Sequence, residues 1–173
     1  FSFRQLLTGR HRQAGVRVAC DLSEVPLDPQ TSAHSINGAS SIEAMPAEVD
    51  RQISSGGYHF LVPQGTHWQS DNGIFSLVAA GYADGYLHLQ YAANKPLALD
   101  NHAELFLYAP DGTQIWHKYT VSYNDYEHDI SYTDFVYPVS YEDLPSCTLT
   151  TDMYTTAARL SGNWQVTFRL EKE

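Results

Sequence analysis

The chain has 173 residues, a length typical of one domain, and its 20 acidic and 10 basic residues give a formal net charge of −10 at pH 7. Four arginines and no acids lie within residues 1–17, so residues 18–173 hold 6 basic and 20 acidic residues, a net charge of −14. Such a charge repels phosphate backbones, which argues against a nucleic-acid partner and favours a basic partner protein. No run of 18 apolar residues occurs, so the sequence predicts no membrane span.

The first 57 residues are predicted to form an irregular N-terminal arm or linker with one short helix. Residues 1–19 are basic, and residues 21–41 are rich in Pro, Ser, Asp, Ala and Gly without a sustained apolar period. A helix over residues 46–54 is predicted, because Pro46 suits the first helical position and two acids follow it in the first turn. An edge strand within the arm is the alternative interpretation of its first residues.

From Tyr58 onward, apolar and polar residues alternate, which is typical of half-buried strands. Two hairpins are predicted, each around a turn that ends in glycine. Their strands are Ile74–Tyr82 with Tyr86–Ala93, and Ala103–Ala109 with Thr113–Tyr123. In the second of these strands, Leu87, Leu89 and Tyr91 are expected to face the core, and His88 to face solvent.

Three further strands are predicted towards the end of the chain: Ile130–Val139, Cys147–Thr151 and Trp164–Leu170. Strands joined by short turns without intervening helices indicate antiparallel sheets. The predicted fold is therefore an all-β antiparallel β-sandwich of seven to eight strands over residues 58–173. The Gly162-Asn163-Trp164 entry, and a Pro-Asp-Gly turn after an apolar strand, resemble bacterial immunoglobulin-like sandwich domains, and the resemblance implies architecture alone.

The two cysteines, Cys20 and Cys147, are predicted to form one disulfide bond in an oxidising compartment. Closing so long a loop contributes roughly 4–5 kcal/mol in the chain-entropy model. The alternative is two free thiols in a reducing compartment. The predicted bond favours a periplasmic or secreted protein, and the lack of an Asn-x-Ser/Thr acceptor favours a bacterial source.

Three acidic residues at alternate positions, Asp125, Glu127 and Asp129, are candidate calcium ligands. Calcium takes hard oxygen ligands in flexible geometry. The segment lacks the central glycine and the late glutamate of an EF-hand loop. The alternative interpretation is a solvated loop between two strands.

Aromatic residues are the candidates for a binding surface, because the 12 tyrosines cannot all fit one small core. Trp68, Trp116, Tyr126 and Tyr137 are predicted to serve as binding residues. Exposed Tyr and Trp favour protein interfaces, since they supply rigid area with a polar tip, and they also stack on sugar rings. The alternative is that most of them pack with their hydroxyl groups at the rim of the core.

These observations predict a non-catalytic extracytoplasmic binding domain for a basic partner protein, such as an inhibitor, an immunity protein or an envelope-assembly component. A carbohydrate-binding module is the first alternative, and it requires a planar row of exposed rings on one sheet face. A hydrolase using histidine and carboxylates is the second, and it requires a pocket that joins His, Asp and Ser. The sequence shows no cofactor motif, so calcium is the one candidate cofactor.

Overall fold

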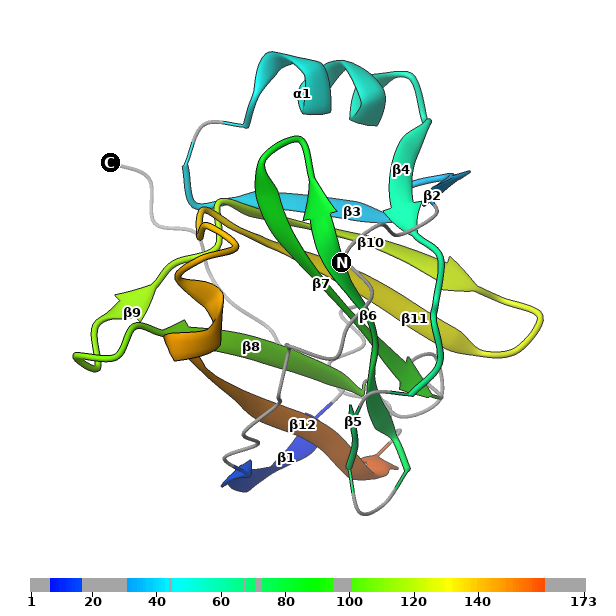
Figure 1. Cartoon of the computed structure of the whole chain (residues 1–173). Coiled ribbons are helices and arrows are strands. Elements are labelled where there is room, and N and C mark those ends of the chain that lie inside the picture. The colour runs from blue at the N-terminus through cyan, green and yellow to red at the C-terminus, as the bar shows by residue number, and fades with distance from the viewer. Residues whose placement is uncertain are drawn as a thin grey trace, which may run out of the picture.

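The computed structural model describes residues 7–16, 31–43, 45–66, 68–70, 73–94 and 101–160. The backbone path alone is described for residues 7–16 and 155–160 and for Thr31, Ala33 and Trp68. Figure 1 shows two sheets packed face to face, with helix α1 (Ala47–Ser54) and a short β2–β4 pair above the larger sheet. The predicted all-β antiparallel sandwich is confirmed.

Every strand pair in the described part of the chain is antiparallel. The four-stranded sheet has the order β1 (Leu7–Val16), β12 (Thr148–Leu160), β8 (His102–Tyr108) and β9 (Gln114–Ile115). The six-stranded sheet has the order β3 (Gly38–Ser41), β10 (Tyr119–Asp125), β11 (Ile130–Tyr137), β7 (Tyr86–Asn94), β6 (Phe75–Ala83) and β5 (Trp68–Gln69). The remaining pair joins β2 (Thr31–His34) to β4 (Tyr58–Leu61).

Two apolar clusters hold the layers together. The first fills the space between the sheets, where Leu89 and Phe135 of the larger sheet meet Leu107 of the smaller one. The second lies on the opposite face of the larger sheet, where Val49 of α1 packs near Val121 of β10. The central strands β7 and β11 are therefore covered on both faces, which explains why most of their residues are buried.

The predicted β6–β7 hairpin is confirmed, and its turn explains the sequence Asp84-Gly85. Both residues have positive φ values, 52° and 81°. A two-residue hairpin turn with two positive φ values is a type I′ turn, and Asp-Gly is one of the sequences that this turn prefers. The short helix is also confirmed, with Glu48 and Asp50 in the first turn of α1 and Gly56 beyond its end.

The stretch Thr113–Tyr123, predicted as one strand, forms two strands in different sheets. β9 pairs with β8, whereas β10 pairs with β11 and β3. Ile115 packs against the first apolar cluster and Tyr119 belongs to the second. The chain must therefore cross between the sheets at residues 116–118.

The first 57 residues contribute more regular structure than the predicted arm. β1 pairs with β12, β2 with β4, and β3 with β10. All four residues of β3 are exposed, so this edge strand carries no apolar period that a sequence pattern could reveal. The described residues form twelve strands, and nine of them lie from residue 58 onward, where seven to eight were predicted. The domain boundary at residue 57 stays a prediction.

Some predictions fall beyond what the structure describes. The strand Trp164–Leu170 lies outside the described residues. The immunoglobulin-like connectivity also stays a prediction. Over the described ranges, no helix combines the length and the apolar character needed to span a bilayer.

Candidate functional site

Three polar side chains meet beneath α1 and β4. His88 Nδ1 lies 2.8 Å from Asp134 Oδ2, and the Tyr58 hydroxyl donates to the same oxygen at 3.1 Å. The side chains of His88 and Asp134 are 6% and 0% exposed. The prediction that His88 faces solvent is wrong, because the layer of α1 and β4 covers that face of the six-stranded sheet.

The contact between His88 and Asp134 is a buried ion pair when the imidazole is protonated. Burial lowers the pKa of His88, but the charge of Asp134, its hydrogen bond and the Ala83 carbonyl together raise that pKa above its usual value. Burial and the neighbouring Asp134 raise the pKa of Tyr58, so its hydroxyl remains a donor at neutral pH. Both neighbours therefore stabilise a carboxylate that is removed from water.

His88 and Asp134 match two of the three groups of a hydrolytic triad, the base and its orienting carboxylate. The third is missing from the described part of the chain, where no hydroxyl or thiol hydrogen-bonds to the buried His88 Nε2. The adjacent Gln90 donates to the Leu61 carbonyl at 3.0 Å, which ties β7 to β4. These contacts join the layers of the fold and supply no nucleophile.

Sequence reasoning missed Tyr58 and Asp134 as members of this cluster. A signal was present, since Asp134 directly precedes the apolar run Phe135–Tyr137. A strand with consecutive apolar residues has both faces buried, which places the adjoining carboxylate in the interior as well. The side chains that contact this carboxylate could not be predicted from the sequence, because they come from other strands and depend on the sheet order.

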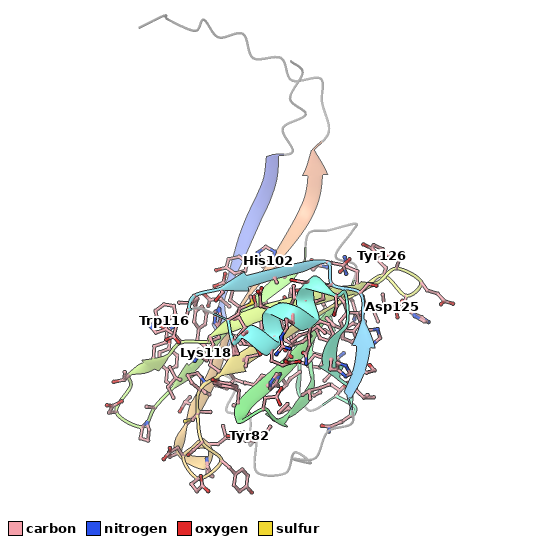
Figure 2. The ribbon with its side chains drawn as sticks, turned by 90° about the horizontal axis from the view of Figure 1, so that it is seen from above. Tyr82, His102, Trp116, Lys118, Asp125 and Tyr126 are labelled. Carbon is pink, nitrogen blue, oxygen red and sulfur yellow. The ribbon has the colours of Figure 1, made fainter. Side chains whose placement is uncertain are left out.

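Two of the four aromatic residues predicted for binding are exposed: Trp116 is 57% and Tyr126 is 65% accessible. Figure 2 shows them on opposite sides of the molecule. Tyr137 is fully buried and donates to the Leu105 carbonyl at 2.6 Å, so its prediction as a surface residue is wrong. β11 directs this ring between the two sheets. The side chain of Trp68 lies outside the described residues.

Trp116 belongs to a surface at the β9 end of the sandwich, which Figure 1 shows opposite the β10–β11 turn. We define this Trp116 surface as Ile42, Glu43, Trp116 and residues 138–147. Lys118, two residues after Trp116, accepts from the Ile42 N–H at 3.1 Å and donates its own N–H at 2.7 Å to the carbonyl of Val136, two residues before Pro138. Ile42 and Tyr141 are also exposed, at 52% and 53%.

The Trp116 surface is acidic. Glu43, Glu142 and Asp143 lie within it, and it contains no basic residue. The neighbouring Lys118 is occupied, since its Nζ lies 3.5 Å from Glu43 Oε2 and 5.1 Å from the centre of the Tyr86 ring. Carboxylates therefore dominate the charge of this surface.

The predicted calcium ligands lie in and beside the β10–β11 turn. Asp125 Oδ1 accepts the backbone N–H groups of Glu127 and His128 at 3.1 Å, and Asp125 Oδ2 lies 2.7 Å from His128 Nδ1. The contact with His128 lowers the pKa of Asp125 and raises that of His128. In the described part of the chain, no three His, Cys, Asp or Glu side chains gather as metal ligands. The geometry therefore gives the calcium prediction no support.

The outer face of the four-stranded sheet carries a second group of aromatic and polar residues. Alternate residues of β8 and β12 point to this face and are half-buried or exposed, while their neighbours are buried. The directly opposite pairs are Tyr108–Thr148, Phe106–Thr150, Glu104–Asp152 and His102–Tyr154. The rings of His102 and Tyr154 stack with centroids 4.9 Å apart and planes inclined by 16°.

A pocket of about 470 Å³ opens at one end of this face, where the β8–β9 hairpin meets the start of β12. Its lining is mostly polar, and we call it the Tyr108 pocket. The lining residues are Tyr108, Ala109, Pro110, Gly112, Thr148, Thr150, Thr151 and Asp152. Gly112 has a φ of 83°, which the tight turn requires and which side chains disfavour. Sequence reasoning missed the pocket, because its lining depends on the pairing of β8 with β12.

Cys147 carries a half-buried free thiol whose Sγ lies 3.5 Å from the Asp143 carbonyl oxygen. Burial and the neighbouring Asp143 raise the pKa of this thiol, which makes it less reactive. Cys20 lies outside the described residues, so the disulfide bond stays a prediction.

Comparison of the chain with protein-family models, with curated proteins and with solved structures gives no match. Its function is therefore inferred from the chemistry and geometry of its own surfaces.

Proposed function

We propose that the protein is a non-catalytic extracytoplasmic binding domain that recognises a basic partner protein through the Trp116 surface. The negative charge of residues 31–154 is the observation that supports this proposal. Residues 31–154 contain 15 acidic and 3 basic residues, a net charge of −12. The two basic side chains described in this range are both paired, Arg51 with Glu48 and Lys118 with Glu43. Such a surface attracts a cationic protein and speeds its encounter.

The exposed rings of the Trp116 surface supply the contact area that charge alone lacks. Trp and Tyr are enriched where binding energy concentrates, because they bury large rigid surfaces and keep a polar tip. The Trp116 surface holds Trp116 and Tyr141 together with three carboxylates, and the Tyr141 ring is supported edge-on by Tyr82, with centroids 6.0 Å apart. Carboxylates would steer Lys and Arg side chains of the partner to the rings, and the rings would hold them in a dry contact.

The proposed role is that of an inhibitor, an immunity protein or an envelope-assembly component that acts in the periplasm or outside the cell. Its placement there rests on the predicted Cys20–Cys147 bond, which needs an oxidising compartment. Recognition of this kind requires no cofactor. The buried His88–Asp134 pair gives the hydrolase alternative less support, because no nucleophile in the described residues contacts His88 Nε2.

Affinity capture from the native source tests the proposal, with the wild-type chain, Trp116→Ala and Tyr126→Ala as three separate baits. The expected result is one basic protein that the wild type and Tyr126→Ala retain and that Trp116→Ala loses. Tyr126 is the matched control, since it is at least as exposed as Trp116 and lies on the opposite side of the molecule (Figure 2). Equal capture by all three baits, or an acidic partner, would contradict the proposal.

A further inference from the structure

The outer face of the β8–β12 ladder presents half-buried rings in a row. Tyr108, Phe106 and His102 lie on the same side of β8, with the exposed Glu104 between Phe106 and His102, and Tyr154 stacks on His102 from the neighbouring strand. Alternate residues of an antiparallel strand are about 7 Å apart, so the row from Tyr108 to His102 extends over about 20 Å. Rings gathered on one sheet face favour sugar binding, because they offer platforms on which sugar rings stack.

The Tyr108 pocket at the end of this row has a lining that selects among ligand classes. None of its described lining residues is a lysine or an arginine, and one of them is Asp152, so these residues favour neutral over anionic ligands such as phosphates. The three threonines make it too polar for a lipid or a flat apolar molecule. Its volume of about 470 Å³ suits a small molecule or one part of a longer chain.

Neutral sugars are the ligand class that best fits this polar lining. Threonine hydroxyls both donate and accept hydrogen bonds, as sugar hydroxyls do, and a carboxylate accepts charge-assisted bonds from them. The Tyr108 ring offers an apolar platform for the C–H face of a sugar ring, because the face of an aromatic ring is electronegative. Asp152 retains this capacity beside its other contacts, since an ionised carboxylate accepts about four hydrogen bonds.

We propose that the outer face of the β8–β12 ladder binds a neutral oligosaccharide, with one sugar ring in the Tyr108 pocket and the next rings along Phe106 and the His102–Tyr154 stack. The row is longer than a single sugar ring, so the affinity rises with the length of the oligosaccharide. The site lies outside the Trp116 surface, and it extends the function of the protein beyond protein recognition. Either site can fail without the other.

The test is a glycan array followed by calorimetric titration of the whole protein. The array carries neutral glucose-, xylose-, mannose- and N-acetylglucosamine-based oligosaccharides of increasing length, with sulfated and sialylated glycans as the charged comparison. Thr148→Val and Tyr108→Ala are the site variants. Thr148 is exposed, so its substitution leaves the fold intact, and Tyr108→Phe keeps the ring. Trp116→Ala is the control at the other surface.

The proposal expects binding of at least one neutral series, with affinity that increases with chain length. Thr148→Val and Tyr108→Ala each lower that affinity about tenfold, while Tyr108→Phe and Trp116→Ala leave it within about twofold. Three outcomes would overturn the proposal. They are an array on which no neutral glycan binds, binding of the charged glycans alone, and neutral-glycan binding that Trp116→Ala abolishes and Thr148→Val leaves unchanged.

Discussion

His88 Nδ1 and Asp134 Oδ2 lie 2.8 Å apart in the interior of the protein, on the neighbouring central strands β7 and β11. Asp134 is the main group that raises the pKa of His88 against the effect of burial. In Asp134→Asn, burial is left as the dominant influence, so we expect the pKa of His88 to fall below the usual histidine value of about 6.5. Titration of the imidazole signals by NMR measures this change, and an unaltered pKa would show that the pair is not formed.

The same pair makes stability depend on pH in a defined direction. The pKa of His88 is raised in the folded state. Protonated His88 therefore contributes fully to the stability of the fold below the unfolded pKa of about 6.5, and this contribution is lost as the pH rises through the folded pKa. We expect the free energy of unfolding in urea to fall across that window in the wild type, and the step to shrink in His88→Gln. The exposed His128 has a shift of the same sign, so His128→Gln is the control that keeps most of the step.

Removing one member of the pair should cost more than removing both. His88→Leu leaves the buried carboxylate with Tyr58 as its remaining donor, and loss of one partner of a buried ion pair costs about 3–5 kcal/mol. The double variant His88→Leu/Asp134→Leu should recover much of this loss, because an apolar pair of similar size is often neutral or stabilising. Chemical denaturation of both variants measures the coupling. Additive losses would show that the two side chains act independently.

The boundary predicted at residue 57 can be tested by truncation. A chain of residues 58–173 lacks α1, whose Val49 belongs to the second apolar cluster with Val121 and Val136, and it lacks β3, which pairs with β10. We expect this fragment to unfold at lower urea concentration than the whole chain and to bind a hydrophobic dye, because it exposes the second apolar cluster. A fragment as stable as the whole chain would mean that residues 1–57 form a separable arm after all.

The predicted Cys20–Cys147 disulfide bond can be tested by mass. Cys147 carries a free thiol in the structure, and Cys20 lies outside the described residues. In an oxidising compartment we expect the bond to form. Intact mass after alkylation without reductant should then show no modified cysteine, and two alkylated thiols would refute the bond.

Sequence patterns predicted the β6–β7 hairpin and helix α1 because local chemistry determines both. Asp84-Gly85 suits a turn with two positive φ values, and Pro46 with following acids suits a helix start. The surroundings of His88 depend on long-range packing instead. Alternation along β7 separates His88 from Leu87 and Leu89, but the pattern says nothing of a third layer that buries the other face as well.

The candidate surfaces show the same contrast between features that local sequence determines and features that long-range packing determines. An exposed Trp116 was predictable, since a chain with so many rings cannot bury them all. Tyr137 belongs to the same class of residue and is buried, because the strand phase of β11 points it between the sheets. The Tyr108 pocket arises where β8 meets β12, which are separated by 40 residues of sequence from Tyr108 to Thr148. Only the sheet order brings them together.

The salt dependence of binding to the captured partner is the most direct test of recognition through an acidic aromatic surface. We expect the wild-type affinity to fall steeply as salt rises, because screening weakens attraction between exposed charges. Glu142→Gln/Asp143→Asn should slow association and flatten that dependence, while Trp116→Ala should mainly speed dissociation. An affinity independent of salt, with the charge variant indistinguishable from the wild type, would contradict the account.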